Sequence, residues 1–302
     1  MCLIAFAIHA STRWPLVIAA NRDEYLDRPT EPLRRWQTAN DHEIISGRDL
    51  LAGGTWLGAT PGGRVAFLTN VREPQPDAAP LSRGSLVTDW LTSSGTAARF
   101  VTDLQSRPGI GADSYGGFNL VLGNFIQGEW WWVSNRSAAF GAGFSASEAC
   151  WQARLLEPGI YGLSNAALDT AWPKTMRLKS VLTKSLAQSL SVGDLQATLW
   201  AALSDGSRAG VGQLPSTGVP PARERALSSA FVDMPDDGYG TRCTTLLVAT
   251  AMQPLEGADG APGWSVEMLE REHLRAVAKP DQARQWNLRS EALTWRVTAT
   301  AP

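Results

Sequence analysis

The stretch LVIAANRDEYLDRP, residues 16–29, decides how this chain begins to fold. It opens with five apolar residues, which are typical of a buried strand. Four polar residues follow directly, and three of them carry charge: Asn21, Arg22, Asp23 and Glu24. An earlier apolar run at 3–8 is separated from this stretch by the polar segment 9–14. The two runs predict a hairpin that is buried on both faces, with the charges at its open end.

A reactive cysteine is predicted at that open end. A turn centred in the segment 9–14 places Cys2 opposite Asn21, with Arg22 and Asp23 just beyond. If the initiator methionine is removed, the thiol and the α-amine of Cys2 belong to one residue. The amine, with a pKa of about 7.7–8.0, can then act as general base for the thiol. A guanidinium such as Arg22 favours the thiolate, and a carboxylate such as Asp23 can orient the ammonium.

A simpler interpretation of the same residues stays open. A cysteine in an apolar strand is often a small core residue. The charged tetrad could be a surface ion-pair cluster, which contributes little to stability. Spacing alone does not decide between the two interpretations.

The composition argues against several classes of partner. The chain has 302 residues and a net charge of −2, without a block of like charges. This argues against nucleic acid or an anionic membrane as partner. No apolar stretch approaches a membrane span. The three cysteines lack paired spacing, which indicates a reducing compartment, and Arg13 interrupts the first apolar segment, unlike a secretory signal. We expect a cytoplasmic protein without an integral membrane segment.

Metal and cofactor motifs are missing from the sequence. The three histidines, His9, His42 and His273, are far apart, and none neighbours a cysteine. No C-x-x-C-H haem-attachment motif occurs. We therefore expect no metal site and no required cofactor.

The order of periodic segments predicts an α+β fold with mostly antiparallel sheet, because strands come as adjacent runs and helices cluster between them. Further strands are expected at 55–59, 65–70, 118–125, 129–134, 242–249, 264–271 and 293–298. Helices are expected at 86–91, 97–104, 173–190 and 192–203. Loops are expected at 72–83, 206–221 and 254–263. None is a clear linker, so residues 1–302 are expected to form a single domain.

A set of short motifs resembles the NRDE family, the Transport and Golgi organisation 2 homologues. The set covers the chain from residue 1 to about 250 in the family's order. It comprises MC (1–2), AANRDE (19–24) with Arg28 and Pro29, GGTWLG (53–58), LTN (68–70), RGSLV (83–87), YGGFNL (115–120), YGLSNA (161–166) with Trp172 and Lys174, and YGTR (239–242).

The resemblance implies a fold similar to the N-terminal nucleophile hydrolases, a four-layer αββα sandwich. Penicillin V acylase and bile salt hydrolase, the nearest functional analogues, use an N-terminal cysteine, an arginine and an aspartate on the second strand, and asparagines that help to hold the oxyanion. The matching candidates here, taken as catalytic, are Cys2, Arg22, Asp23, Asn70, Asn165 and Arg242.

Other residues are candidates for ligand contact. Asn21 and Glu24 complete the charged tetrad, and Trp56 is a candidate pocket wall, with a place in the core as the alternative. Tyr239 lies in a glycine-flanked loop before Arg242. An arginine buried there needs an anion, which could be a protein or a substrate carboxylate. Cys243 is expected to be structural.

The resemblance implies two functions, and a third remains open. Family members are linked to haem mobilisation and to acyl-lipid or acyl-CoA handling. The first hypothesis is thus an intracellular carrier of haem or another apolar ligand, with arginine pairing the propionates, Cys2 as a possible axial thiolate, and an unidentified haem-receiving protein. The second is an N-terminal cysteine amidohydrolase that cleaves linear, non-peptide C–N bonds. The third is a scaffold without a small ligand. The sequence leaves open whether the protein is an enzyme.

Overall fold

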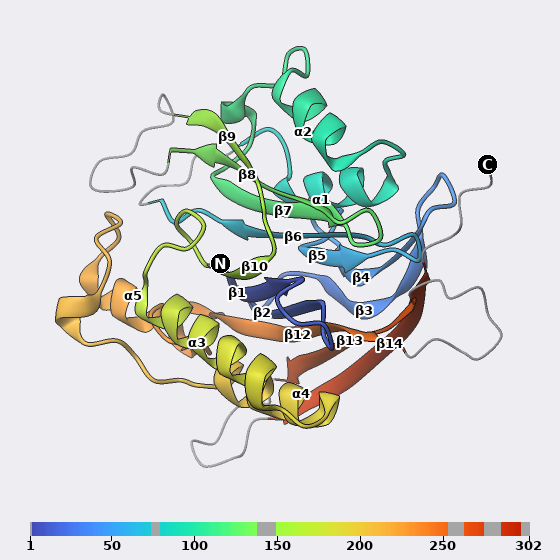
Figure 1. The fold of residues 1–302 in the computed structure, drawn as a ribbon. Helices are drawn as coiled ribbons and strands as arrows, with labels where there is room; N and C mark the ends of the chain where they lie inside the picture. The colour runs from blue at the N-terminus through green and yellow to red at the C-terminus, as the bar shows by residue number, and fades with distance from the viewer. Residues whose placement is uncertain (1, 74–78, 138–148, 253–262, 275–284, 297–302) are drawn as a thin grey trace, which may run out of the picture.

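Two antiparallel sheets stack face to face, and helices cover both outer faces (Figure 1). The computed structural model describes residues 2–73, 79–137, 149–252, 263–274 and 285–296. Helices α1 and α2 lie on one sheet, and α3 and α4 lie on the other (Figure 1). This arrangement confirms the predicted α+β class with four layers.

The first sheet holds the predicted N-terminal hairpin. Its strand order is β10-β1-β2-β12-β13-β14, and β11 pairs with β12. The strands are β1 (Cys2–Ile8), β2 (Leu16–Tyr25), β10 (Gly159–Leu163), β11 (Asp233–Met234), β12 (Tyr239–Ala251), β13 (Gly263–Leu274) and β14 (Gln285–Arg296). The hairpin strands therefore lie inside the sheet, between β10 and β12, and bury both faces as predicted.

The second sheet follows the chain order β3 to β9 as a meander. Its strands are β3 (Thr30–Gln37), β4 (Glu43–Asp49), β5 (Leu57–Ala59), β6 (Arg64–Asn70), β7 (Phe118–Asn124), β8 (Glu129–Arg136) and β9 (Ala149–Leu155). The sequence did not predict β3, β4, β9, β10 or the short β11. In β3, a proline and two arginines hide the apolar alternation on which a strand prediction depends.

The helices start and end close to the predicted positions. They are α1 (Arg83–Thr92), α2 (Ala97–Gln105), α3 (Pro173–Gln188), α4 (Val192–Leu203) and the unpredicted α5 (Pro221–Ala226). Ser191 caps α4 by accepting from Asp194 N–H, while Asp194 accepts from Ser191 N–H. The structure describes no helix that is both long and apolar enough to cross a membrane.

The main core lies between the two sheets. Alternate residues of β1 enter it, and the intervening ones pack under α3 and α4. The residues that face the second sheet are Ile4, Phe6 and Ile8, and those that face the helices are Leu3, Ala5 and Ala7. A side chain's position along β1 or β2 therefore decides which of two buried environments it enters.

The hairpin register differs from the prediction by one residue. Cys2 pairs with Arg22, so the expectation that it lies opposite Asn21 is wrong. The turn includes Pro15 as well as the segment 9–14, because the Pro15 carbonyl accepts from His9 N–H at 2.6 Å, and β2 begins at Leu16. Because alternate side chains point to opposite faces, this shift puts Cys2 and Arg22 together on the inter-sheet face. Asn21 points to the helix side instead.

Some predicted boundaries also shift. The strand expected at 293–298 is the end of β14, which begins at Gln285, and residues 297–298 lie outside the described residues. Residues 74–78 of the loop expected at 72–83 and residues 254–262 of the loop expected at 254–263 also lie outside them. The loop expected at 206–221 contains the short 3₁₀ helix Val211–Gln213 and ends where α5 begins.

Candidate functional site

Cys2 and Arg22 are direct cross-strand neighbours on the inter-sheet face. Cys2 is 7% exposed and Arg22 is 6% exposed. The Arg22 guanidinium stacks on the indole of Trp56 with its Cζ 4.2 Å from the ring centroid. Its Nη2 lies 3.8 Å from a carboxylate oxygen of Glu24. Its Nη1 has no hydrogen-bond partner among the described residues, so a buried donor is available beside the thiol.

Opposing effects act on the pKa of the Cys2 thiol. Burial raises this pKa, and the Asp23 carboxylate adds to the rise. The Arg22 charge and a hydrogen bond from the backbone of Asp23 act in the opposite direction, because both favour the thiolate. The balance leaves the pKa of the Cys2 thiol above its usual value, although groups that favour the thiolate lie beside it.

Asp23 is held rigidly on the helix side of the same sheet. Its side chain is 1% exposed and accepts from the Thr241 hydroxyl at 2.7 Å. The Tyr239 hydroxyl donates to the Asp23 carbonyl at 2.9 Å. Burial raises the pKa of the Asp23 carboxyl, and the nearby Lys174 ammonium acts against this rise. Tyr239, predicted as a ligand contact, is 4% exposed and supports Asp23 in this structure.

Lys174 is the main residue that sequence analysis did not place in the site. It lies in the first turn of α3, is 3% exposed, and donates from Nζ to the carbonyl of Leu227 at 2.9 Å. Burial lowers the pKa of Lys174 to about 8, while the charge of Asp23 opposes the shift. A lysine in a family motif gives no signal of burial, since lysines near helix ends are mostly exposed.

A hydrogen-bonded segment after β10 joins Cys2 to the end of β6. The Ser164 hydroxyl donates to the Cys2 carbonyl at 3.0 Å, and the Thr69 hydroxyl donates to the Ser164 carbonyl at 2.5 Å. The Asn165 amide donates to the Asn70 carbonyl at 2.9 Å. The two predicted asparagines are thus brought together next to Cys2. Their role at an oxyanion stays a prediction, because the Asn165 amide donates to Asn70 here.

A buried ion pair lies next to this segment. Arg72 and Glu224 form it, and both side chains are 3% exposed. The Arg72 backbone N–H donates to the carbonyl of Asn165 at 2.8 Å, and the Arg72 guanidinium lies over the Trp172 ring. The pair thereby fixes α5 and the start of α3 against the site, and removal of either partner would leave a buried charge.

Two other predicted residues have mainly structural contacts. The Asn21 amide donates to the carbonyls of Leu203 and Ala230, both at 2.8 Å, and its oxygen accepts from Thr244 at 2.6 Å. It therefore joins the end of α4 to the sheet, on the face away from the thiol. Arg242 lies at the β-bulge in β12 and donates to the carbonyls of the turn after β2. Whether either residue contacts a ligand stays a prediction.

Glu24 and Trp56 stay close to the thiol. Glu24 is 20% exposed and lies between Arg22 and Arg28 at 3.8 Å and 4.0 Å. Trp56 is 9% exposed, belongs to the inter-sheet core, and forms one wall of the Arg22 environment. Trp56 thus lies in the core, one of its two predicted alternatives, and its role as a pocket wall stays a prediction.

Cys243 flanks Arg22 on the opposite side from Cys2. It pairs with Arg22 across β12 and β2 and is 5% exposed. Burial raises the pKa of Cys243 well above its usual value, and the neighbouring Glu270 carboxylate adds to the rise. Glu270 is 2% exposed and accepts from Leu33 N–H at 2.8 Å and from the Thr245 hydroxyl at 3.2 Å.

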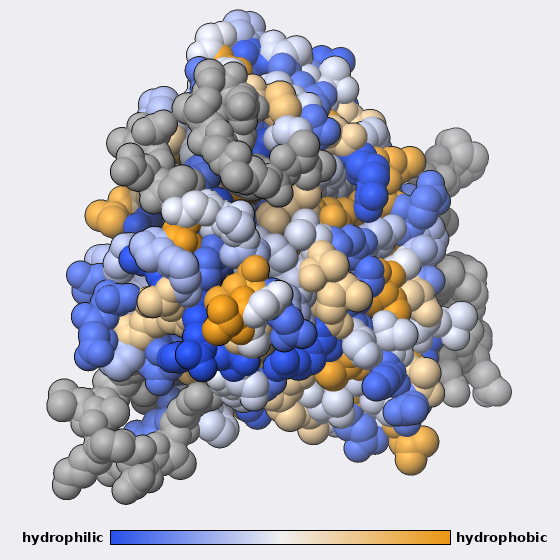
Figure 2. All heavy atoms as spheres, turned by 90° about the vertical axis from the view of Figure 1, so that its left-hand side faces the viewer, coloured by the Kyte–Doolittle hydropathy of each residue, from blue (hydrophilic) through white to orange (hydrophobic). Residues whose placement is uncertain are grey.

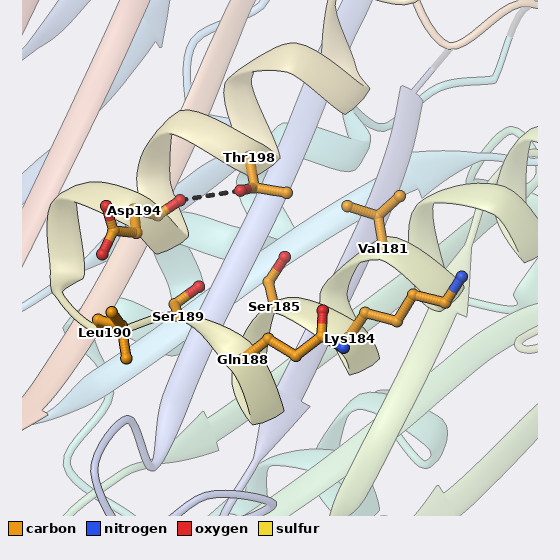
Figure 3. Close-up of a pocket in the computed structure, with 8 residues that line it drawn as sticks. All are labelled: Val181, Lys184, Ser185, Gln188, Ser189, Leu190, Asp194 and Thr198. Atoms are coloured by element: carbon orange, nitrogen blue, oxygen red, sulfur yellow. Dashed lines mark hydrogen bonds between the residues drawn. The ribbon is translucent and has the colours of Figure 1, made fainter.

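The side of the molecule that carries α5 and the N-terminal end of β1 has a mixed surface. Figure 2 shows hydrophobic residues there as separate small groups among hydrophilic ones. A surface groove lies elsewhere, between the end of α3 and the start of α4 (Figure 3). Val181, Leu190 and Asp194 are among its lining residues, and none of the predicted site residues lines it. Within the described ranges, no cluster of metal-ligand side chains occurs.

The chain is thus an α+β sandwich with a buried cysteine–arginine–aspartate site near its N-terminus. A family model described as Transport and Golgi organisation 2 matches residues 1–256. The Transport and Golgi organization protein 2 homolog of Homo sapiens is 30% identical over 270 residues, which is 83% of this chain and 89% of the human protein. The Bos taurus homolog is 31% identical with the same coverage of each chain. The chain belongs to the Transport and Golgi organisation 2 family.

Two solved structures show a distant likeness. The Caenorhabditis elegans N-acylethanolamine-hydrolyzing acid amidase ortholog matches with 12% identity and a TM-score of 0.44, over 82% of this chain and 92% of that chain. The conjugated bile acid hydrolase from Clostridium perfringens, as a mutant, matches with 8% identity and a TM-score of 0.38, over 99% and 97%. Likenesses of this size carry no information about the activity of this chain.

Proposed function

We propose that this protein is a thiol-dependent acyl-transfer enzyme that hydrolyses a linear amide, with Cys2 as nucleophile. The observation that carries the proposal is the placement of the Cys2 thiol directly opposite the buried Arg22 guanidinium. A buried cation without a bidentate carboxylate partner is costly to maintain in a folded protein. Beside a thiol, the Arg22 guanidinium can serve catalysis, because it stabilises the thiolate and the anion that forms at the attacked carbonyl.

The reaction needs a proton acceptor near the thiol. After removal of the first residue, the α-amine of Cys2 takes the thiol proton, and the carboxylate of Asp23, held by Thr241, orients the resulting ammonium. The thiolate attacks the amide carbonyl and forms a C–S bond. The C–N bond then breaks, and the amine leaves with the proton from the ammonium. Water attacks the thioester and restores the thiol, which releases the acid.

Lys174 adds a positive charge next to Asp23 and Cys2. Its ammonium acts on both Asp23 and Cys2, and its pKa of about 8 leaves it mainly charged at pH 7. It therefore helps to keep the Asp23 carboxylate ionised in spite of its burial. Ionised Asp23 is the form that orients an ammonium.

A carrier of haem or an acyl-lipid is the second candidate. The observation that favours it is the set of cationic side chains near Cys2, since Arg242 has only carbonyl partners among the described residues and could pair with a propionate or phosphate. The buried carboxylate of Asp23 and the polar segment at Ser164 favour the enzyme instead, because an apolar ligand would gain little from them. We rank the carrier second.

The deciding experiment measures three properties of one purified sample. Intact mass shows whether Met1 is removed. A panel of fluorogenic N-acyl amides of increasing acyl length measures turnover in the wild type, Cys2→Ala and the matched control Cys150→Ala. A haem titration follows the Soret band. We expect Met1 to be removed and turnover to depend on Cys2 alone. Turnover that persists in Cys2→Ala would end the enzyme proposal, and a stoichiometric Soret shift that requires Cys2 would favour the carrier.

A further inference from the structure

Arg83 is a cation near Cys2 that the proposed reaction does not use. It is the first residue of α1, and burial lowers the pKa of its guanidinium. Its electrostatic neighbours include Glu24, Glu73 and Cys2. Among the described residues no carboxylate lies within ion-pair distance of it, and its one hydrogen bond is a long contact of 3.3 Å from Nη1 to the carbonyl of Gly117.

The nearest carboxylates are already paired with other cations. Glu73 accepts from Arg136 Nε at 2.7 Å in a pair whose side chains are 5% and 7% exposed. Glu24 lies between Arg22 and Arg28. Arg83 therefore adds positive charge to the site that these carboxylates do not neutralise by direct contact.

Gly116 and the neighbouring Gly84 leave the space in which Arg83 and the start of α1 are held. A Cβ built on Gly116 would lie 3.3 Å from Arg83 Nη1. Gly84 packs against the backbone of Gly53 and Thr55, where an added Cβ would lie within 3.4 Å of backbone atoms. Side chains at these positions would crowd the start of α1. The motifs RGSLV, YGGFNL and GGTWLG thus meet around this arginine.

Three sources of positive charge lie near Cys2: the Arg83 guanidinium, the N-terminus of α1 and the Arg22 guanidinium. The α1 N-terminus adds partial positive charge, because Ser82 makes no side-chain cap there. Arg22 contributes a second, independent donor, since its Nη1 has no hydrogen-bond partner among the described residues and the side chain is 6% exposed. Trp56 connects the two arginines, because its indole lies under Arg22 and its neighbour Thr55 donates from N–H to the carbonyl of Gly84.

We propose that Arg83 and the unpartnered Nη1 of Arg22 bind an anionic group of the substrate, a carboxylate or a phosphate, beside the Cys2 thiol. The inference rests on the proposed role of Cys2 as nucleophile and adds the class of substrate, an amide with an oxyanion group close to its scissile bond. Arg83 is then the residue that selects charged over neutral acyl compounds.

Two alkylating reagents of nearly equal size test this selection. Iodoacetate carries a carboxylate and iodoacetamide does not. The ratio of their alkylation rates at Cys2 therefore reports the local electrostatic potential. The intrinsic reactivity of the thiol affects both rates equally and drops out of the ratio. Peptide mapping by mass spectrometry resolves Cys2 from Cys150, which serves as the internal control. The variants are Arg83→Met, Arg83→Lys and the matched exposed control Arg99→Met on α2.

We expect the iodoacetate-to-iodoacetamide ratio at Cys2 to exceed that at Cys150 by on the order of tenfold at low salt, as for one close charge pair that is largely surrounded by water. Arg83→Met should remove most of this preference, Arg83→Lys should keep part of it, and Arg99→Met should leave it unchanged. A ratio at Cys2 that is the same in wild type and Arg83→Met overturns the inference. Cys2 that reacts with neither reagent in the native protein overturns the proposed function instead.

Millimolar acetate or inorganic phosphate, added as a competitor of iodoacetamide, distinguishes the two kinds of anion. If phosphate alone protects Cys2 from alkylation, the anionic group of the substrate is a phosphate. If acetate protects it, the group is a carboxylate. Protection that is as strong in Arg83→Met as in wild type counts against Arg83 as the binding residue.

Discussion

Cys2 and Cys243 flank the same guanidinium, yet their surroundings prepare them for different roles. Both pair with Arg22 across neighbouring strands, and both are buried. Cys2 has a backbone hydrogen bond from Asp23, whereas Cys243 faces the Glu270 carboxylate, which raises its pKa further. A nearby arginine therefore does not make a cysteine reactive by itself. A carboxylate raises the pKa of both thiols, and the difference lies in the hydrogen bond, which comes from the Asp23 backbone at Cys2 and lowers the pKa, and involves the Glu270 side chain at Cys243 and raises it.

The two thiols also cannot form a disulfide with each other. They lie on opposite neighbours of β2, so two strand spacings, about 9–10 Å, separate their backbones. A disulfide needs Cα atoms closer than about 7 Å. Loss of one thiol therefore breaks no covalent link to the other, and this permits a direct comparison of single variants.

The largest expected difference is between the two alanine variants. Cys2→Ala should abolish thiol-dependent turnover and native-state alkylation at the site, because no second nucleophile replaces it. Cys243→Ala should keep both within about twofold and should lose roughly 1 kcal/mol of stability through the small cavity. Urea unfolding of both variants supplies the stability measurement. Equal loss of turnover in the two variants would show that Cys2 and Cys243 do not differ in their role.

The next effect is on stability and involves Lys174, whose charge acts on Cys2. Its folded pKa of about 8 lies below the unfolded value of 10.5. Between these pH values the unfolded chain binds a proton that the folded protein lacks, so this residue makes stability rise with pH there, by about 3 kcal/mol. Below pH 8 the full cost of the buried charge is present.

The measurement is the difference in unfolding free energy between wild type and Lys174→Met from pH 7.5 to 10.5. A difference is needed because buried tyrosine and cysteine groups have the opposite dependence on pH in this range. A difference that stays flat over the range would show that Lys174 titrates normally, and that it is not held in the environment described.

The next effect is that of Arg22 on the reactivity of Cys2. In Arg22→Met the alkylation rate of Cys2 by iodoacetamide at pH 7 should fall by about tenfold, since one unit of pKa shift corresponds to 1.4 kcal/mol of thiolate stabilisation. Arg22→Lys should recover part of the rate. The midpoint of the pH–rate profile should move upward by about one pH unit. An unchanged midpoint would assign Arg22 a purely structural role.

The smallest expected effect belongs to Trp56. In Trp56→Phe the stacking surface under Arg22 shrinks, and the interaction loses about 0.5–1 kcal/mol. We expect a two- to fivefold decrease in Cys2 alkylation with little change in the unfolding midpoint. A larger loss of stability than of reactivity would indicate that Trp56 acts mainly through core packing.

The sequence by itself determined the hairpin, the two-sided burial of its strands, the α+β class and the meeting of Cys2 with the Asn-Arg-Asp-Glu tetrad. These follow from local patterns, because apolar runs and polar turns specify strands without knowledge of their neighbours. The family motifs also marked Asn165 and Asn70, which the structure brings together.

Only the tertiary structure decided the register, the face of each side chain and the residues that approach from far along the chain. A turn longer by one residue moved Cys2 from Asn21 to Arg22, and sequence patterns do not resolve a slip of that size. Lys174 and Arg83 lie far from Cys2 along the chain, and no local pattern marks them as its neighbours. Their charges act on the thiol because they are buried together with it. Charges interact strongly only where water is excluded from between them.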